Sequence, residues 1–440
     1  MDVYLKNSNV QLFRLTVSLL SSISCCLLLL YPESNVASVF NILVSLLLFL
    51  HPVTLIPVIF VASISSSISI LGFSALFYYL FLFILSAVLR KGIRLHVPKK
   101  KSILFLAVFL GWLVICSMCS VSGNVYESLK LCFTIVLFVI CLSLNICSWK
   151  QARKELDRFA VLCMPVILFK LVLLPSAFVI EGLYSTRILS SVSETLNPNQ
   201  LGISMAVLFV MEFAILCKKR HMRHLIALAC LFAILLILKG RTSFFSAILV
   251  SGIYLMSECR INKKMKFFIY ALIVIVSAVF VVRTISDIDS YEDSAESNEA
   301  GKEMSVSSVI QSDGSGRFVT WAFAFSEIIP EHYIHGIGIG VTNYEAIGYE
   351  RDADNLYVDL LTEIGIPGFI LFFLFYFLLM TEIKKHTGIY DRSGRLYVYL
   401  MILMLMCGIG ETLFDSSFLW MIIFLGFLTL QTRKRKLKTI

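Results

Sequence analysis

The sequence predicts an all-α protein that crosses a membrane many times. Three observations lead to this class: 58% of the 440 residues are apolar, the mean hydropathy is +0.86, and the apolar residues form long continuous runs. A soluble chain of this size could not bury so much apolar surface. Since the runs do not alternate with a period of two, they also exclude the pattern of a membrane β-barrel.

The apolar runs define the expected spans. The first run ends near Leu30 and is expected to stay uncleaved, because no compact apolar region leads to a small-residue cleavage site. The others are 36–50, 53–71, 73–90, 102–120, 126–147, 158–181, 200–217, 222–238, 241–257, 266–283, 357–381, 395–411 and 414–431. Pro52, Pro57 and the serine run Ser63–Ser69 weaken the assignment around 53–71. We expect about 12 to 14 spans.

Basic residues predict the orientation. The formal net charge is +9, but Lys and Arg gather in short clusters between apolar runs, the strongest being Arg90–Lys101. Such clusters are typical of cytoplasmic loops. We therefore expect both termini in the cytoplasm and the long polar stretch Thr284–Asn355 on the opposite side. This placement accounts for the charge without a nucleic-acid partner.

The same pattern divides the chain into three expected parts. Residues 1–283 are expected to form an N-terminal transmembrane bundle and residues 284–356 a large loop with interfacial helices on the side opposite the cytoplasm. Residues 357–440 are expected to form the C-terminal transmembrane helices and a basic cytoplasmic tail. The cysteines lie in or beside apolar runs, and no Cys or His spacing resembles a zinc or haem motif. We expect neither a metal nor a cofactor.

Three arginines, Arg187, Arg241 and Arg317, lie in loops expected on the outer side. A guanidinium group binds phosphate oxygens through two parallel hydrogen bonds and remains ionised in a partly dry site. Three of them would suit a lipid-linked diphosphate. The alternative is ion pairing with carboxylates of the same loops.

The segment Gly316–Ile329 predicts a helix that Pro330 ends. Phe318, Trp321, Phe325, Ile328 and Ile329 form an apolar stripe along it. Arg317 lies one turn before Trp321 on the same face. We expect the helix to lie at the bilayer surface, with the indole as its anchor and the arginine at headgroup height.

Two further segments hold candidate site residues. The run His335–Gly340 lacks the ending of a nucleotide loop, and a structural turn is favoured over backbone amides that bind an anion. His335 could also act as a base near neutral pH. Asp354 and Asn355 begin the next helix, where they would either cap it or face a site. Glycines and Pro367 in Gly365–Gly368 are expected to break that helix.

Five segments in this order resemble the O-antigen polymerase and O-antigen ligase superfamily. They are Arg187–Gly202, Leu238–Ala247, Gly316–Ile328, His335–Gly340 and Asp354–Gly368. The resemblance implies a bundle similar to the GT-C membrane glycosyltransferases. It also implies glycan transfer from undecaprenyl diphosphate to an acceptor hydroxyl at the periplasmic face of the bacterial inner membrane. The implied partners are undecaprenyl-diphosphate-linked oligosaccharides, membrane lipid and, in addition, a chain-length regulator.

The resemblance also assigns roles. Arg187, Arg241 and Arg317 would neutralise the diphosphate leaving group, with Arg317 counted as catalytic together with Asp354. The remaining residues expected to bind substrate are Asn199, Gln200, Trp321, His335 and Asn355. Ligases of the family place a histidine where this chain has Asp354, and this departure favours the polymerase.

Two other functions stay open. One is ligation of the glycan to lipid A-core, and the other is a flippase or transporter of lipid-linked oligosaccharides. Transporters usually carry ionisable residues at mid-membrane, for which Lys130, Lys170 and Glu212 are the few candidates.

Overall fold

The computed structural model describes residues 2–31, 34–65, 68–70, 73–91, 100–144, 146–173, 198–238, 241–258, 317–348, 353–387, 392–414 and 416–431. Within these stretches the protein is almost entirely helical. Five helices are long and apolar enough to cross a bilayer, and shorter apolar helices accompany them. The predicted all-α, multi-span class is confirmed.

Most of the expected spans correspond to observed helices. The five long apolar helices are α1 (Asp2–Leu30), α5 (Lys101–Met118), α6 (Tyr126–Ser143), α8 (Pro198–Lys219) and α16 (Leu356–Thr387). The bundle also contains α2 (Asn35–Phe49), α4 (Ala75–Lys91), α7 (Trp149–Leu173), α9 (Met222–Ile237), α10 (Arg241–Glu258), α17 (Arg392–Cys407) and α18 (Ser417–Gln431). The expected span 266–283 lies outside the described residues.

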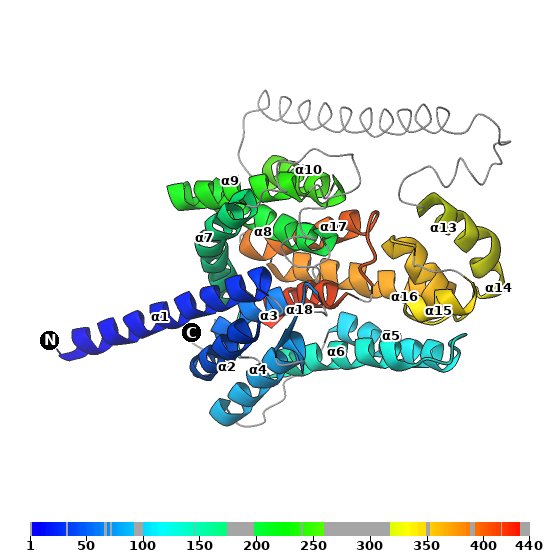
Figure 1. Ribbon diagram of the computed structural model, residues 1–440, viewed down its shortest axis with the longest axis horizontal. Helices are drawn as coiled ribbons and strands as arrows, with labels where there is room; N and C mark the ends of the chain where they lie inside the picture. Colours follow the sequence, from blue (N-terminus) through cyan, green and yellow to red (C-terminus); the bar gives the residue numbers. More distant parts are fainter. Residues whose placement is uncertain are drawn as a thin grey trace.

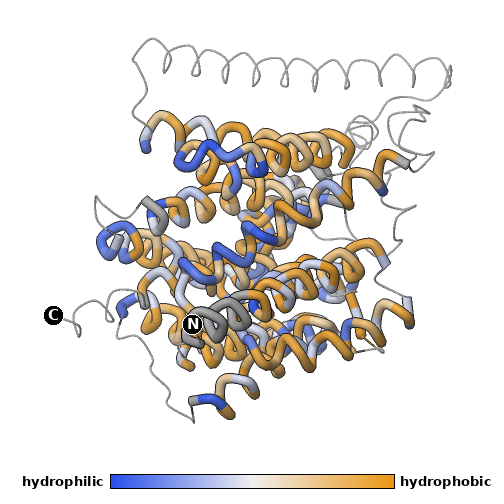
Figure 2. Tube along the Cα trace, turned by 90° about the vertical axis from the view of Figure 1, so that its left-hand side faces the viewer, coloured by the Kyte–Doolittle hydropathy of each residue, from blue (hydrophilic) through white to orange (hydrophobic). Residues whose placement is uncertain are grey.

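Helix α16 runs through the middle of the bundle (Figure 1) and packs against α5, α17 and α18. Aromatic rings fill these contacts: Phe109 of α5 lies 5.8 Å from Phe372 of α16 and 6.2 Å from Trp420 of α18, measured between ring centroids. The helices are hydrophobic over most of their length, and the hydrophilic stretches are short (Figure 2). Many leucines and phenylalanines remain exposed on the outside, as expected of a surface that faces lipid.

The expected span 53–71 is wrong as a single helix. Its residues form a 3₁₀ turn (η1, Pro52–Leu55), the short helix α3 (Ile56–Ala62) and a two-stranded antiparallel hairpin, β1 (Ser69–Ile70) and β2 (Phe73–Ser74). Every residue of α3 is buried. Prolines at the start and serines at the end shorten the helix, and backbone of this kind is tolerated at membrane depth only inside protein.

The predicted break in α16 is confirmed at Gly365, which has φ 69° and ψ 178° between two helical segments. The carbonyl of Ile364, which loses its helical partner there, accepts a hydrogen bond from Trp112 Nε1 at 3.0 Å. A Cβ on Gly365 would lie 2.2 Å from the carbonyl oxygen of Ile334, so glycine is required by both conformation and space. The loop that precedes α16 therefore packs directly against this break.

The helix predicted over Gly316–Ile329 is present in modified form. It comprises α13 (Arg317–Phe323), a π-helical turn η4 (Ala324–Ile328) and α14 (Ile329–Glu331), so it ends one residue beyond Pro330. The wide turn divides the predicted apolar stripe: Ile328 is buried, whereas Phe325 is 57% exposed. Together with α15 (Val341–Ala346), these helices lie at one end of the bundle, beside the start of α16 (Figure 1).

Candidate functional site

Asn355 is the residue that caps α16. Its Oδ1 accepts hydrogen bonds from the amides of Tyr357 at 2.9 Å and Val358 at 3.2 Å. Its Nδ2 donates to the carbonyl of Ile409 at 2.8 Å, and the side chain is buried. The capping role predicted for this pair is thus filled by Asn355. Its side chain also links the start of α16 to the turn that follows α17.

Asp354 precedes the cap and has a different geometry. Its φ of 49° lies in the left-handed region, where aspartate is one of the few residue types found regularly. Its side chain is half-exposed. Asp354 is therefore presented at the surface of the loop, while its neighbours Ala353 and Asn355 are buried.

The loop conformation depends on Asp359, a buried carboxylate that sequence analysis missed. Its Oδ1 accepts from the amide of Ala353 at 3.0 Å and from Tyr344 Oη at 3.3 Å. Its Oδ2 accepts from the amide of Asn355 at 3.2 Å and from Thr412 Oγ1 at 2.8 Å. With four donors the buried charge is well compensated. An acid in the first turn after a capping asparagine was the available signal, since such acids reach back to free amides.

The starts of α10 and α16 lie against the turn Gly408–Thr412, and the start of α8 packs against that of α10. The amide of Leu356, the first residue of α16, donates to the Gly408 carbonyl at 2.8 Å. A Cβ on Gly410 would lie 2.4 Å from Oγ1 of Thr242, in the first turn of α10. Likewise, a Cβ on Gly202 in the first turns of α8 would lie 2.7 Å from Oγ of Ser243. We call this region the helix-start cluster: the first turns of α8, α10 and α16 with the turn 408–412.

The helix-start cluster brings together several predicted residues. Asn199 and Gln200, both partly buried, lie in the first turn of α8, and Arg241 is the first residue of α10, although its side chain lies outside the described residues. Glu411, an acid of the central turn, is 7% exposed. Amide groups at helix starts carry partial positive charge. The first amides of α16 are already bonded to Gly408 and Asn355, so it is the starts of α8 and α10 that favour an anion here.

Trp321 connects α13 to the same region. Its Nε1 donates to the carbonyl of Ala353 at 2.7 Å, directly before Asp354. The indole also packs with a small buried cluster that includes Ile328 and Tyr344. Arg317 begins α13 one turn earlier, but its side chain lies outside the described residues, and so does the whole of Arg187.

The glycine run His335–Gly340 packs against the break in α16. The amide of Gly338 donates to the Glu363 carbonyl at 3.1 Å, and the amide of Gly340 donates to Glu363 Oε1, also at 3.1 Å. These amides are engaged within the protein, which supports the turn interpretation over anion binding. Nδ1 of His335 lies 2.7 Å from the carbonyl of Gly336, so this histidine belongs to the turn and not to the helix-start cluster.

Comparison with known proteins adds an independent finding. No curated protein matches the chain. The model of the family described as O-antigen ligase matches residues 226–373. This region contains Arg241, Arg317, Trp321, His335 and Asp354 together with the first turns of α10 and α16. Over this region the chain is similar to the O-antigen ligase family, and the match supports the resemblance to the O-antigen ligase and polymerase superfamily, whose members are glycosyltransferase-like enzymes of O-antigen assembly.

Proposed function

We propose that the chain is an O-antigen polymerase. It would move the growing glycan from undecaprenyl diphosphate to the non-reducing end of a new lipid-linked repeat unit, at the periplasmic face of the bacterial inner membrane. The observation that carries the proposal is the helix-start cluster, because it gathers the starts of α8, α10 and α16 beside a loop that presents Asp354. Such a site offers the positive starts of α8 and α10 to an anion, and it offers a nearby carboxylate to an acceptor.

The proposed reaction forms one glycosidic bond and breaks one phosphoester bond. The acceptor hydroxyl oxygen bonds to the anomeric carbon of the growing glycan, and the bond from this carbon to the diphosphate oxygen breaks, with its electrons leaving on the diphosphate. The hydroxyl proton passes to Asp354. Arg187, Arg241 and Arg317 would neutralise the charge on the departing diphosphate. Asn199 and Gln200, in the first turn of α8, are proposed to contact the substrate.

The proposed topology follows from charge. Both termini would face the cytoplasm and Thr284–Asn355 the periplasm, which puts the helix-start cluster at the periplasmic end. The bundle would be of the GT-C type. A chain-length regulator is proposed as a further partner, since a polymerase needs a limit to extension.

A ligase that uses lipid A-core as acceptor is the nearest alternative, because the family description names a ligase. A transporter is less well supported. Lys130 pairs with Glu127 at 3.0 Å near the start of α6, and Lys170 donates to the Leu30 carbonyl at 2.9 Å. These local partners are typical of lysines near helix ends and do not suggest a transport path. The third candidate, Glu212, is buried, with its Oε2 2.8 Å from Nδ1 of His224.

Reconstitution with one defined substrate tests the proposal. The full-length protein in liposomes receives a single undecaprenyl-diphosphate-linked repeat unit, and the products are separated by size. A ladder of longer glycans is expected. Glycan transfer that occurs only when lipid A-core is added would show that the protein is a ligase and not a polymerase. Movement of substrate between leaflets without new glycosidic bonds would overturn both enzyme assignments.

A further inference from the structure

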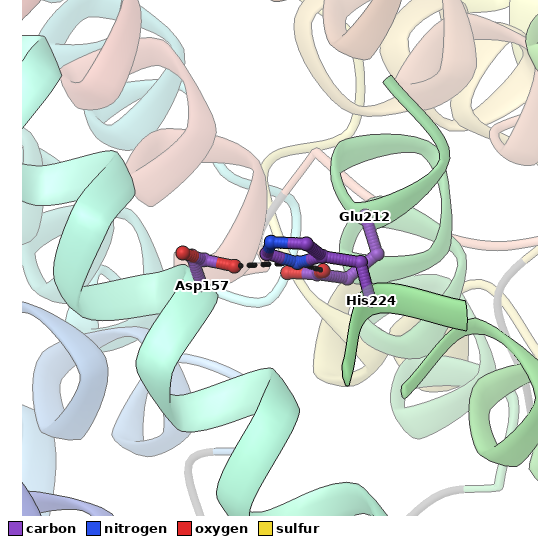
Figure 3. Close-up of side chains that lie close together, drawn as sticks. All are labelled: Asp157, Glu212 and His224. Atoms are coloured by element: carbon purple, nitrogen blue, oxygen red, sulfur yellow. Dashed lines mark hydrogen bonds and ion pairs between the residues drawn. The ribbon is translucent and has the colours of Figure 1, made fainter. Parts of the chain in front are cut away.

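Three ionisable side chains meet inside the bundle, away from the helix-start cluster. They are Asp157 of α7, Glu212 of α8 and His224 of α9 (Figure 3). Nδ1 of His224 lies 2.8 Å from Glu212 Oε2 and 3.1 Å from Asp157 Oδ1. Glu212 lies fourteen residues after the start of α8, which places the group roughly 20 Å along that helix from the helix-start cluster.

The group contains carboxylate oxygens that the surrounding protein does not satisfy. Glu212 and His224 are both 0% exposed and Asp157 is 9% exposed. Among the described residues, Glu212 Oε1 and Asp157 Oδ1 are buried and accept no hydrogen bond. A single imidazole N–H cannot satisfy both carboxylates, and a buried acid without a partner is costly. Either a proton shared by the two carboxylates or a bound cation is required between these oxygens.

We propose that Asp157, Glu212 and His224 bind a divalent transition-metal cation of the Zn²⁺ class. The three donor atoms lie within 4.8 Å of one another, so small side-chain shifts would bring them around one ion. One imidazole nitrogen with two carboxylate oxygens suits Zn²⁺, whereas Mg²⁺ and Ca²⁺ prefer oxygen donors only. The unsatisfied oxygens on Glu212 and Asp157 become ligands, and water completes the coordination.

The surroundings of His224 set one condition for this site. Arg223 Nε donates to His224 Nε2 at 3.3 Å, which leaves the proton on Nδ1. Metal binding through Nδ1 moves the proton to Nε2, so the arginine hydrogen bond must break. Arg223 is exposed and can turn into solvent. Arg223 therefore competes with the metal, both through this bond and through its positive charge.

The bound ion would connect α7, α8 and α9, which already pack against one another. Its effect is on the stability of this end of the bundle, and it takes no part in glycan transfer. The proposal is therefore independent of the polymerase assignment. The three ligands come from positions 157, 212 and 224, too far apart to form a recognisable metal-binding motif.

Metal binding to the wild-type protein is the first test. The full-length protein in detergent, with its affinity tag removed, is stripped with a chelator and then equilibrated with Zn²⁺ or Mg²⁺. Elemental analysis is expected to find about one Zn²⁺ per chain, and Zn²⁺ but not Mg²⁺ is expected to raise the thermal unfolding midpoint. Wild-type protein that retains no Zn²⁺ and shows no shift overturns the proposal, and the carboxylates then share a proton instead.

Variants assign the ion to this group. Glu212→Gln and Asp157→Asn are expected to lose the bound Zn²⁺ and the thermal shift. Glu155→Gln is the matched control on α7, since Glu155 pairs with Arg158 at 2.7 Å and is expected to leave Zn²⁺ binding unchanged. Zn²⁺ retained in both ligand variants overturns the assignment.

If the variants of the buried residues fail to fold, Arg223→Gln still tests whether Zn²⁺ binds at His224. The exposed position tolerates substitution, and loss of the competing bond and charge is expected to lower the dissociation constant for Zn²⁺ by on the order of tenfold. An unchanged or higher dissociation constant contradicts a site at His224.

Discussion

Asp359 holds Asp354 in place from five residues downstream, because its carboxylate accepts hydrogen bonds from the amides on both sides of Asp354. The Ala353 amide lies 3.0 Å from Oδ1 and the Asn355 amide 3.2 Å from Oδ2. This clamp stabilises the left-handed conformation of Asp354 at φ 49°. A buried acid thus determines where a half-exposed acid is presented, and the first two predictions below concern this relationship.

Asp354→Asn tests the proposed base. Asparagine also adopts left-handed backbone readily, so the loop is expected to keep its conformation. An amide cannot take the acceptor proton, and the rate of chain extension is expected to fall by about 10²–10⁴-fold. The measurement is the initial rate of ladder formation in liposomes, with thermal unfolding as the control for folding. A rate near that of the wild type would leave Asp354 as a structural residue only.

Asp359→Asn tests the clamp. The variant retains the shape of the side chain, but an amide group offers one acceptor oxygen in place of two, and buried donors are left unpaired at a cost of about 1–3 kcal/mol each. Chain extension is expected to fall on the order of tenfold while the protein remains inserted in the membrane. Thr412→Val is the matched control, since it removes a single donor to Oδ2, and a smaller loss is expected. Equal effects of the two variants would argue against the clamp.

Arg317→Ala and Arg241→Ala test the diphosphate site. Removal of one group that stabilises charge on a leaving group typically lowers a rate by about 10²–10³-fold, and a loss of this size is expected for each variant. Arg317→Lys keeps the charge but loses the planar fork and is expected to recover only part of the rate. Wild-type ladder length in Arg317→Ala would remove this arginine from the mechanism.

Gly365→Ala tests the contact between the break in α16 and the loop that precedes this helix. The residue has φ 69°, and a Cβ would lie 2.2 Å from the carbonyl oxygen of Ile334. The variant is expected to lower the free energy of unfolding by about 3 kcal/mol or more. Gly111→Ala in α5 is the matched control, because no atom lies within 4 Å of its added Cβ, and it is expected to be neutral or slightly stabilising. A similar unfolding midpoint in both variants would contradict this account of the break.

The sequence predicted the helices well wherever a local property was sufficient. Length and apolar composition located α5, α6 and α8, and the glycine and proline signals located the break at Gly365. The same reasoning failed over 53–71, where an apolar run forms the buried helix α3 and continues into a short hairpin. Hydropathy cannot distinguish a segment buried against lipid from one buried against its own chain.

The candidate site was predicted less completely. Asp354 and Asn355 were identified together, but the structure separates them into a half-exposed acid and a buried cap. Asp359 was missed because its role depends on partners as distant as Thr412. His335 was grouped with the site on chemical type, whereas its contacts belong to the glycine turn.

Sequence alone determined the membrane class, most of the helices and the family resemblance, because apolar runs and short motifs are read from residues close together in the chain. Tertiary structure alone decided that the starts of α8, α10 and α16 meet around the turn 408–412, and that Asp157, Glu212 and His224 meet inside the bundle. The physical reason is that helix packing brings together residues tens to hundreds of positions apart. No local sequence pattern predicts which helix ends become neighbours.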